Sequence, residues 1–381
     1  MGLPLSGPVS ATSAISTPIR LSSMSLSADS VREAISKHPD PESGRSLASM
    51  DQIKDVSVQG NDVTITIGLT THSMPIVDDF RDALQAKVVA GNPGAKVDVQ
   101  IVEHQRPPAR IGQIGLRARS VIAVGSGKGG VGKSTVAASV ALTLRRMGAK
   151  VGLMDADVYG PSLPHLLGLS GRPAISEDKK IEPIRLDGDL PVMSMGFLVE
   201  PDQAVIWRGT MLHGSINQFL SDTDWGELDY LIIDMPPGTG DVALTLSQAL
   251  PLAGSVVVCT PQEVALLDAI KAISMFRKVN IPILGMVENM SGFTCPDCSK
   301  TYDIFGSGGA RDRAEQTNVP YLGGLPINID LRIAGDEGRL AEVIAENGPA
   351  CAPLNAITQA IVRNLAAKAA TAPPTASLPT L

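Results

Sequence analysis

One glycine-rich run restricts the fold of this chain more than any other feature. Gly127-Lys-Gly-Gly-Val-Gly-Lys-Ser134 fits the pattern G-x4-G-K-[ST], and it follows the apolar run Val121–Val124 and opens a helix-like segment that reaches Met147. A strand, this loop and then a helix form the context in which the pattern binds phosphate. Its glycines let backbone N–H groups face the phosphates, and the helix N-terminus adds its positive dipole end.

Two side chains of this loop carry chemistry of their own. We expect Lys133 to reach the β and γ phosphates of a nucleotide and the Ser134 hydroxyl to ligate Mg²⁺. The alternative is an unoccupied glycine-rich turn, against which both the motif and its context argue. The predicted nucleotide-binding residues of this segment are Gly127, Lys128, Gly129, Gly130, Val131, Gly132, Lys133, Ser134 and Thr135.

Short apolar runs recur after the loop and predict the fold class. They lie at 150–154, 230–233, 255–259 and 283–287, with helix-like stretches between them. Continuous apolar strands that alternate with helices indicate an α/β fold with a doubly wound, mostly parallel sheet. We therefore expect a P-loop ATPase domain over residues 120–367, with a last helix over 354–367.

A smaller α+β domain is predicted ahead of this sheet. Helix-like segments at 30–35 and 77–89 and alternating strands at 55–58, 63–69 and 96–102 form an αββαβ unit over residues 27–104. Residues 105–119 read as a linker. Residues 1–26 and the Ala/Pro/Thr-rich 368–381 read as disordered tails.

The cysteines predict a metal site that one chain cannot complete. Cys295 and Cys298 have the C-x2-C spacing of thiolate ligands, but Cys259 and Cys351 form no second pair. Cys259 lies in an apolar strand and is expected in the core. A closed tetrahedral site needs four donors, which a symmetric homodimer supplies if the loop lies near its twofold axis. Thiolates suit either an iron–sulfur cluster or zinc, so both metals remain open at this point.

Composition narrows the location and the partners. The net charge of −7 argues against a general nucleic-acid binder, and no apolar run approaches the length of a membrane span. Four cysteines in 381 residues do not make a disulfide scaffold. We therefore expect a reducing, cytoplasmic compartment, with no nucleic-acid or membrane partner.

Several motifs together resemble the Mrp/ApbC family, iron–sulfur P-loop ATPases of the MinD/ParA class with a deviant Walker A motif. The matching segments are GSGKGGVGKST, MDADVYGPSLPHLLG, WRG, LIIDMPPGTGD and ENMSGFTCPDC. One departure is Thr210, where the family usually has proline. The resemblance implies a homodimer that hydrolyses ATP slowly and transfers clusters to iron–sulfur apoproteins. It implies that assembly factors are further partners of the protein. It also implies that Cys295 and Cys298 hold a [4Fe-4S] cluster shared between two subunits.

The same resemblance implies roles for residues outside the loop. Lys128, the early lysine of the deviant motif, would cross to the phosphates of the partner subunit. Asp157 would orient the attacking water, and Asp155 would support the Mg²⁺ shell. Asp234 ends a strand in the manner of a Walker B aspartate and would hold Mg²⁺ through water. Asn289 would read the adenine edge, with Pro326 near the base.

The N-terminal segment resembles a small iron–sulfur assembly domain. Asp40-Pro-Glu-Ser-Gly44 and Leu69-Thr-Thr-His-Ser-Met-Pro75 carry this match. Standalone relatives commonly have a cysteine where this chain has Met74, which argues against thiol chemistry here. His72 is either a ligand or an ordinary loop residue.

Two alternatives belong to other function classes. A ParA- or MinD-like positioning ATPase would act on DNA or membrane, but such proteins usually carry a basic surface or a basic C-terminal helix. This chain is acidic overall, and its tail is Ala/Pro/Thr-rich. The other alternative is a dimeric ATPase clasped by zinc through the same four sulfurs.

Overall fold

The computed structural model describes residues 26–158, 160–198, 209–238 and 240–371. The predicted disordered tails therefore lie outside the described residues over 1–25 and 372–381. Residues 159, 207–208 and 239 of the quoted motifs also lie outside them. Within the described ranges, no helix has the length and apolar character needed to cross a bilayer.

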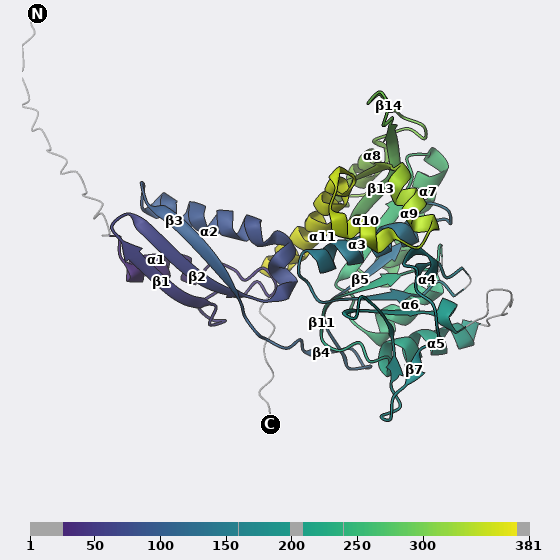
Figure 1. Cartoon of the computed structure of the whole chain (residues 1–381), viewed down its shortest axis with the longest axis horizontal. Coiled ribbons are helices and arrows are strands. Elements are labelled where there is room, and N and C mark those ends of the chain that lie inside the picture. The colour runs from purple at the N-terminus through teal and green to yellow at the C-terminus, as the bar shows by residue number, and fades with distance from the viewer. Residues whose placement is uncertain (1–25, 159, 199–208, 239, 372–381) are drawn as a thin grey trace, which may run out of the picture.

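The N-terminal part forms a small three-stranded sheet backed by two helices (Figure 1). Its strands are β1 (Ile53–Gln59), β2 (Asp62–Leu69) and β3 (Lys96–Glu103). The helices are α1 (Ala28–Ser36) and α2 (Val77–Gly91). The helix α2 buries Phe80, Leu84 and Val88, a four-residue spacing that points one stripe at the sheet. These side chains pack with alternate β2 residues such as Ile65 and Ile67.

The larger sheet has ten strands in the order β14-β13-β12-β5-β11-β6-β10-β9, with β15 beside β13 and β4 beside β5. The pairs from β13 through β10 are parallel, whereas β9 and β14 join antiparallel at the two ends. The parallel core strands are β5 (Leu116–Gly125), β6 (Val151–Asp155), β10 (Leu190–Ser194), β11 (Leu228–Asp234), β12 (Gly254–Cys259), β13 (Ile283–Thr294) and β15 (Tyr321–Ile327). The short strands of this sheet are β4 (Arg110–Ile111), β9 (Ile184–Leu186) and β14 (Thr301–Tyr302), whereas β7 (Ala174–Ile175) and β8 (Ile181–Glu182) pair in a separate two-stranded sheet.

Helices cover both faces of this sheet, which explains its continuous apolar strands. In β5, Ile122 and Val124 join the core on one face, whereas Val121 and Ala123 join the core on the other. The first face carries α3 (Lys133–Arg146), α4 (Leu163–Leu166), α9 (Ile329–Asp336), α10 (Leu340–Glu346) and α11 (Ala352–Thr371). The second carries α5 (Gly209–Asp222), α6 (Gly240–Ala249), α7 (Glu263–Lys278) and α8 (Gly309–Gln316).

Two element boundaries differ from the sequence-based expectation. The predicted linker 105–119 includes β4 and the start of β5, because Leu116 and Ala118 are buried in the main core. The last helix ends at Thr371 rather than at residue 367, so the first residues of the predicted C-terminal tail are helical. Of the parallel core strands, β10 and β15 were not predicted at all.

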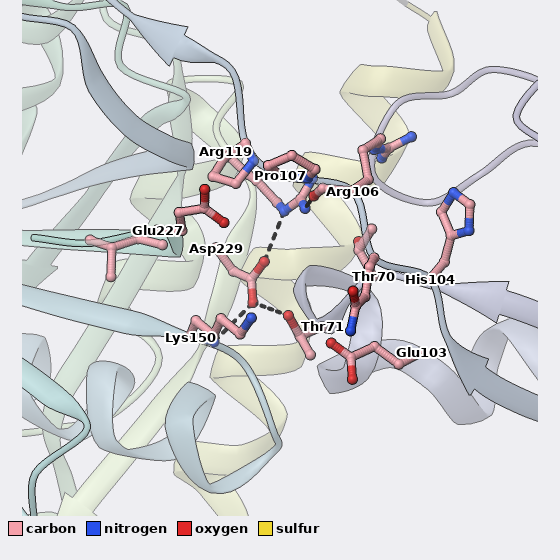
Figure 2. Close-up of a pocket in the computed structure, with 13 residues that line it drawn as sticks. Thr70, Thr71, Glu103, His104, Arg106, Pro107, Arg119, Lys150, Glu227 and Asp229 are labelled. Atoms are coloured by element: carbon pink, nitrogen blue, oxygen red, sulfur yellow. Dashed lines mark hydrogen bonds and ion pairs between the residues drawn. The ribbon is translucent and has the colours of Figure 1, made fainter.

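The N-terminal part docks on the large sheet at the end where the central strands β5 and β11 begin. Asp229, at the start of β11, accepts hydrogen bonds from the Thr71 hydroxyl at 2.5 Å and from the Lys150 backbone N–H at 2.9 Å. Its other oxygen lies 2.9 Å from Nε of Arg119, which also pairs with Glu42 at 2.6 Å. Figure 2 shows Thr71, Arg119, Lys150 and Asp229 converging beside a cavity of about 400 Å³ between the two parts.

The TTHSMP segment forms the centre of this docking surface, as the short 3-10 helix η1 (Thr71–Ile76). His72 stacks on Tyr230 with ring centroids 4.4 Å apart, and its Nε2 lies 3.0 Å from the Ser120 hydroxyl. The Tyr230 hydroxyl donates to the His72 carbonyl at 2.5 Å. Met74 lies against Gly148, where a β-carbon would be 3.8 Å from its side chain. His72 is therefore an interface residue, buried at 4 % exposure, rather than an open loop ligand.

Candidate functional site

The glycine-rich loop joins the end of β5 to the start of α3, as its motif requires. Gly130 and Gly132 have φ values of 79° and 78°, a left-handed conformation that glycine adopts without strain. A β-carbon on Gly127 would lie 2.0 Å from the Asp268 carbonyl oxygen. These three positions therefore need glycine for backbone reasons alone, before any ligand is considered.

Lys133 and Asp234 form a buried ion pair at the carboxyl ends of the strands. The Lys133 ammonium lies 2.5 Å from one Asp234 oxygen and 3.2 Å from the Ser134 hydroxyl. The second Asp234 oxygen is buried and has no hydrogen-bond partner. Burial raises the pKa of Asp234, against the lowering effect of Lys133. An orphaned carboxylate oxygen near a serine hydroxyl fits a hard cation that prefers oxygen ligands.

Asp155 lies on β6 directly beside Asp234 of β11 in the sheet register. Its two oxygens accept four hydrogen bonds within the protein, at 3.0–3.3 Å, from the backbone N–H groups of Asp157, Ser162 and Leu163 and from the Ser194 hydroxyl. Burial, and then the charge of Asp234, raise the pKa of Asp155 to about 7.

The two acidic residues of this loop thus have different surroundings. Asp155 is fully buried and organises the loop that carries the half-buried Asp157. Asp155 therefore holds the loop of Asp157 through hydrogen bonds, and its expected support of the Mg²⁺ shell stays a prediction. Sequence reasoning missed Ser194, because no motif marks it and it lies on the unpredicted strand β10. Lys128 is half-buried beside the loop glycines.

A cavity of about 420 Å³ adjoins the loop, and Asp234 is not among the residues that line it. Asn289 and Pro326, which the family resemblance assigns to the base, both line it, beside Gly132 and Thr135 of the loop segment. The Asn289 amide donates to the Val131 carbonyl at 2.8 Å. The apolar lining residues include Leu166, Met290, Phe305, Leu325, Ile327, Leu331, Pro349, Pro353 and Leu354. A largely apolar cavity that has the Asn289 amide next to a phosphate loop suits a nucleotide base.

The C-x2-C pair projects from the end of β13. Phe293 pairs with Tyr302 of β14, so that residues 295–300 form the tip of a hairpin. The Cys295 N–H donates to the Lys300 carbonyl at 3.0 Å, and Cys295 is half-buried whereas Cys298 is exposed. Hydrogen bonds from the backbone of Cys298 and Asp297 lower the pKa of the Cys295 thiol.

The other two cysteines lie elsewhere in the fold and are buried. Burial raises the pKa of Cys259 to about 12 and also raises that of Cys351. In the part of the chain that the structure describes, no group of three or more His, Cys, Asp or Glu side chains is arranged to hold a metal ion. One chain therefore offers two accessible thiols at a single site.

Comparison with known families matches both parts of the chain. The family described as ParA: NUBPL iron-transfer P-loop NTPase matches residues 117–362, and the iron–sulfur cluster assembly protein family matches residues 28–101.

Individual relatives agree with the family matches. An "iron-sulfur cluster carrier protein" of Synechocystis is 44% identical over 354 residues, which cover 90% of this chain and 98% of the relative. The mouse "iron-sulfur cluster transfer protein NUBPL" is 50% identical over 223 residues, which cover 58% of this chain and 70% of the relative.

A solved structure, of a nucleotide-binding protein from Archaeoglobus fulgidus in complex with ADP, is also similar. It is 42% identical with a TM-score of 0.53, and the match covers 60% of this chain and 89% of that chain. The family match over residues 117–362 contains the P-loop, the parallel sheet and the cysteine hairpin. The chain belongs to the NUBPL iron-transfer P-loop NTPase family.

Proposed function

We propose that this protein carries iron–sulfur clusters and transfers them to apoproteins, with slow ATP hydrolysis in a homodimer. The observation that carries the proposal is the course of β13. Asn289 of this strand contacts the phosphate loop at Val131, and the same strand continues to Cys295 six residues later. One strand thus joins the nucleotide site to the pair of accessible thiols.

For the nucleotide, the geometry supports ATP on the loop with its base in the adjoining cavity. Lys133 would leave Asp234 to meet the β and γ phosphates, and Lys128 would reach the phosphates bound by the partner subunit. Ser134 and the free Asp234 oxygen would hold Mg²⁺, which neutralises charge on the phosphates when bound. Asp157 would orient the attacking water, with Asp155 holding its loop in place.

For the cluster, the cargo is a [4Fe-4S] unit bound by Cys295 and Cys298 of two subunits. Each chain supplies two sulfurs, and a twofold axis near the hairpin tip supplies the other two. The exposure of the tip favours release to a recipient. The partners would be iron–sulfur apoproteins and assembly factors, in the reducing environment of the cytoplasm.

Anaerobic reconstitution tests this proposal. Reduced protein is loaded with iron and sulfide, and the product is followed by absorbance, iron content and size-exclusion chromatography. We expect a broad charge-transfer band near ~400 nm, dimers, and one cluster per two chains. Cys295→Ala with Cys298→Ala should remove the band, whereas the matched control Cys351→Ala should keep it.

Several results would contradict the proposal. A full cluster on each monomer would contradict a site that two subunits share. Zinc in protein that was made with ample iron would favour a zinc-clasped dimer. Salt-dependent DNA binding would favour a positioning ATPase instead. Transfer itself is measured as activation of a purified apoprotein by the loaded wild-type dimer.

A further inference from the structure

The cysteine hairpin begins and ends at the base cavity. Asn289 and Met290 of β13 lie where the chain goes into the hairpin, and Phe305 lies where it comes out, three residues after the end of β14. All three residues line the same cavity next to the loop residue Gly132. The two thiols at the tip therefore stand on a stem whose two sides both face the space that we assign to the nucleotide base.

A buried carboxylate ties the two feet of this hairpin together. Glu288 is fully buried, and one of its oxygens accepts from the Ser291 hydroxyl at 2.5 Å and from the Gly308 N–H at 2.8 Å. Its other oxygen accepts from the Ala310 N–H at 2.7 Å, in the first turn of α8. Charge-assisted hydrogen bonds of this kind hold their partners firmly. The feet of the hairpin are thus fixed to each other, close to the cavity wall.

The backbone leaves regular strand geometry at left-handed turns beside these anchored feet, and the β13–β15 pairing is irregular between Asn289 and Phe293. Met290 has a φ of 58° and Gly292 one of 81° on the outgoing side, and Gly306 has a φ of 90° on the returning side. Left-handed residues of this kind absorb changes of direction between a fixed element and the segment that follows it. Phe305 lies directly beside one of these turns.

We propose that Phe305 contacts the nucleotide base, and that filling the cavity through this contact sets the position of the Cys295–Cys298 tip. Phe305 is 38% exposed at the rim of a cavity whose other walls are mostly aliphatic. An aromatic face at such a rim suits stacking on a base, as aromatic side chains do in nucleic-acid sites. The inference rests on the proposed nucleotide site, but it does not depend on the identity of the cargo.

The neighbouring residues of the hairpin supply a matched control. Ile304 is 56% exposed, so it is at least as accessible as Phe305, but it does not line the cavity. Ile304→Ala therefore removes an exposed apolar side chain from the same segment and leaves the base contact intact. Phe305→Leu keeps apolar volume at the rim and removes only the aromatic face.

The experiment uses reduced, cluster-free, full-length protein. Binding of ADP and of pyrophosphate is measured by calorimetry, and modification of the two accessible thiols by dithionitrobenzoate is timed with each ligand at saturation. In the wild type, ADP should change the modification rate and pyrophosphate should not. Phe305→Ala should weaken ADP about five- to tenfold, leave pyrophosphate affinity unchanged, and abolish the ADP-dependent change in rate. Phe305→Leu should lie between the wild type and Phe305→Ala in both its ADP affinity and its ADP-dependent change in modification rate.

The outcomes separate this inference from the proposed function. An unchanged ADP effect on the thiols in Phe305→Ala at saturation would overturn it, as would an equal loss in Ile304→Ala. A pyrophosphate effect as large as that of ADP would place the signal in the phosphate loop instead. A wild type that does not bind ADP would remove the nucleotide site itself. Failure of cluster loading leaves these cluster-free measurements intact.

Discussion

The Lys133 ammonium lies 2.5 Å from the Asp234 carboxylate, and both side chains are buried, at 6% and 0% exposure. This pair joins the first residue of α3 to the last residue of β11. Each charge is balanced by the other as long as no phosphate or cation takes its place. When a nucleotide binds, Lys133 therefore exchanges Asp234 for phosphate, and Asp234 exchanges Lys133 for a cation.

The first prediction concerns this exchange. Lys133→Met leaves a buried carboxylate without its partner, which should lower the free energy of unfolding by about 3–5 kcal/mol. Lys133→Met with Asp234→Asn should regain most of that loss, because no uncompensated charge remains. Neither variant should bind ADP tightly. Urea unfolding and ADP calorimetry check both points, and a Lys133→Met variant as stable as the wild type would contradict the buried pair.

The second prediction concerns the loop glycines. Gly127→Ala places a β-carbon 2.0 Å from a backbone oxygen, so the loop must move and ADP binding should fall by about tenfold or more. Gly129 is the matched control, since the nearest atom to its β-carbon would be Pro237 Cγ at 3.9 Å. Gly129→Ala should therefore keep the melting temperature of the wild type, whereas Gly127→Ala should lower it. Equal melting temperatures for the two variants would argue against the close packing at Gly127.

The third prediction compares two arginines at the domain interface: Arg119, which pairs with Asp229 of its own domain and with Glu42 across the interface, and Arg363, which pairs with Asp79 across it. Arg119 and Asp229 have side chains that are 9% and 3% exposed, whereas those of Arg363 and Asp79 are 48% and 47% exposed. Arg119→Ala should lower the free energy of unfolding by about 3–5 kcal/mol. Arg363→Ala should change it by about 1 kcal/mol or less, because water screens the exposed pair. Urea unfolding followed by circular dichroism measures both, and similar losses would show that burial does not govern this interface.

The fourth prediction is a pH dependence from the same interface. Burial lowers the pKa of His72 below its ordinary value of 6.5, against the raising effects of Glu42 and Asp229. Below pH 6.5 the unfolded chain therefore binds a proton that the folded ring does not, and stability falls as the pH falls. His72→Phe keeps a ring against Tyr230 and removes this proton.

The measurement is urea unfolding at about pH 7.5 and about pH 5.5. The loss of stability between the two should be smaller in His72→Phe than in the wild type. Burial also lowers the pKa values of His38 and His104, whereas the raised pKa of Asp155 acts in the opposite direction, so the difference between the two proteins is what reports on His72.

Glu42 adds a second loss at lower pH. Burial opposes ionisation of this carboxyl, but His72, the Thr70 hydroxyl, Arg119 and Arg106 together lower its pKa below the ordinary 4.5. Since burial keeps His72 neutral near pH 7, we assign the effect there to Thr70 and the two arginines. The stability that Glu42 contributes is present above pH 4.5 and is lost as the pH falls through its lower, folded pKa.

For the His72 prediction, an identical dependence of stability on pH in His72→Phe and in the wild type would contradict the buried, neutral ring.

The phosphate loop and the central strands could be predicted because their signals are local. A loop motif spans a few residues, and strands such as β5 are apolar along their whole length because both faces are covered. Strand β10 could not be predicted in this way. Its run Leu190-Pro-Val-Met-Ser194 contains a proline and follows a glycine-containing turn, although Val192 pairs with Leu153 of β6.

Contacts between distant residues were beyond prediction for a different reason. The position of Asp155 at a strand end was expected, but its partner Ser194 lies 39 residues away. His72 was read as a loop residue or a ligand, because nothing near it in the sequence shows that Tyr230 will cover its ring. Local pattern places a side chain on an element, whereas its partners depend on how the elements pack.

The docking of the N-terminal part also has a consequence for the order of synthesis. Thr71 can form its hydrogen bond only after Asp229, 158 residues later, has been synthesised. Asp79 can form its ion pair only after Arg363, 284 residues later, has been synthesised. At a ribosomal rate of roughly 5–20 residues per second, the second interval lasts roughly 15–60 s. The His72 ring has no cover until Tyr230 has been made, 158 residues later, and the Asp79 carboxylate has no partner until Arg363 has been made. The nascent chain therefore presents part of this docking surface to chaperones and to other nascent chains until the last helix has emerged.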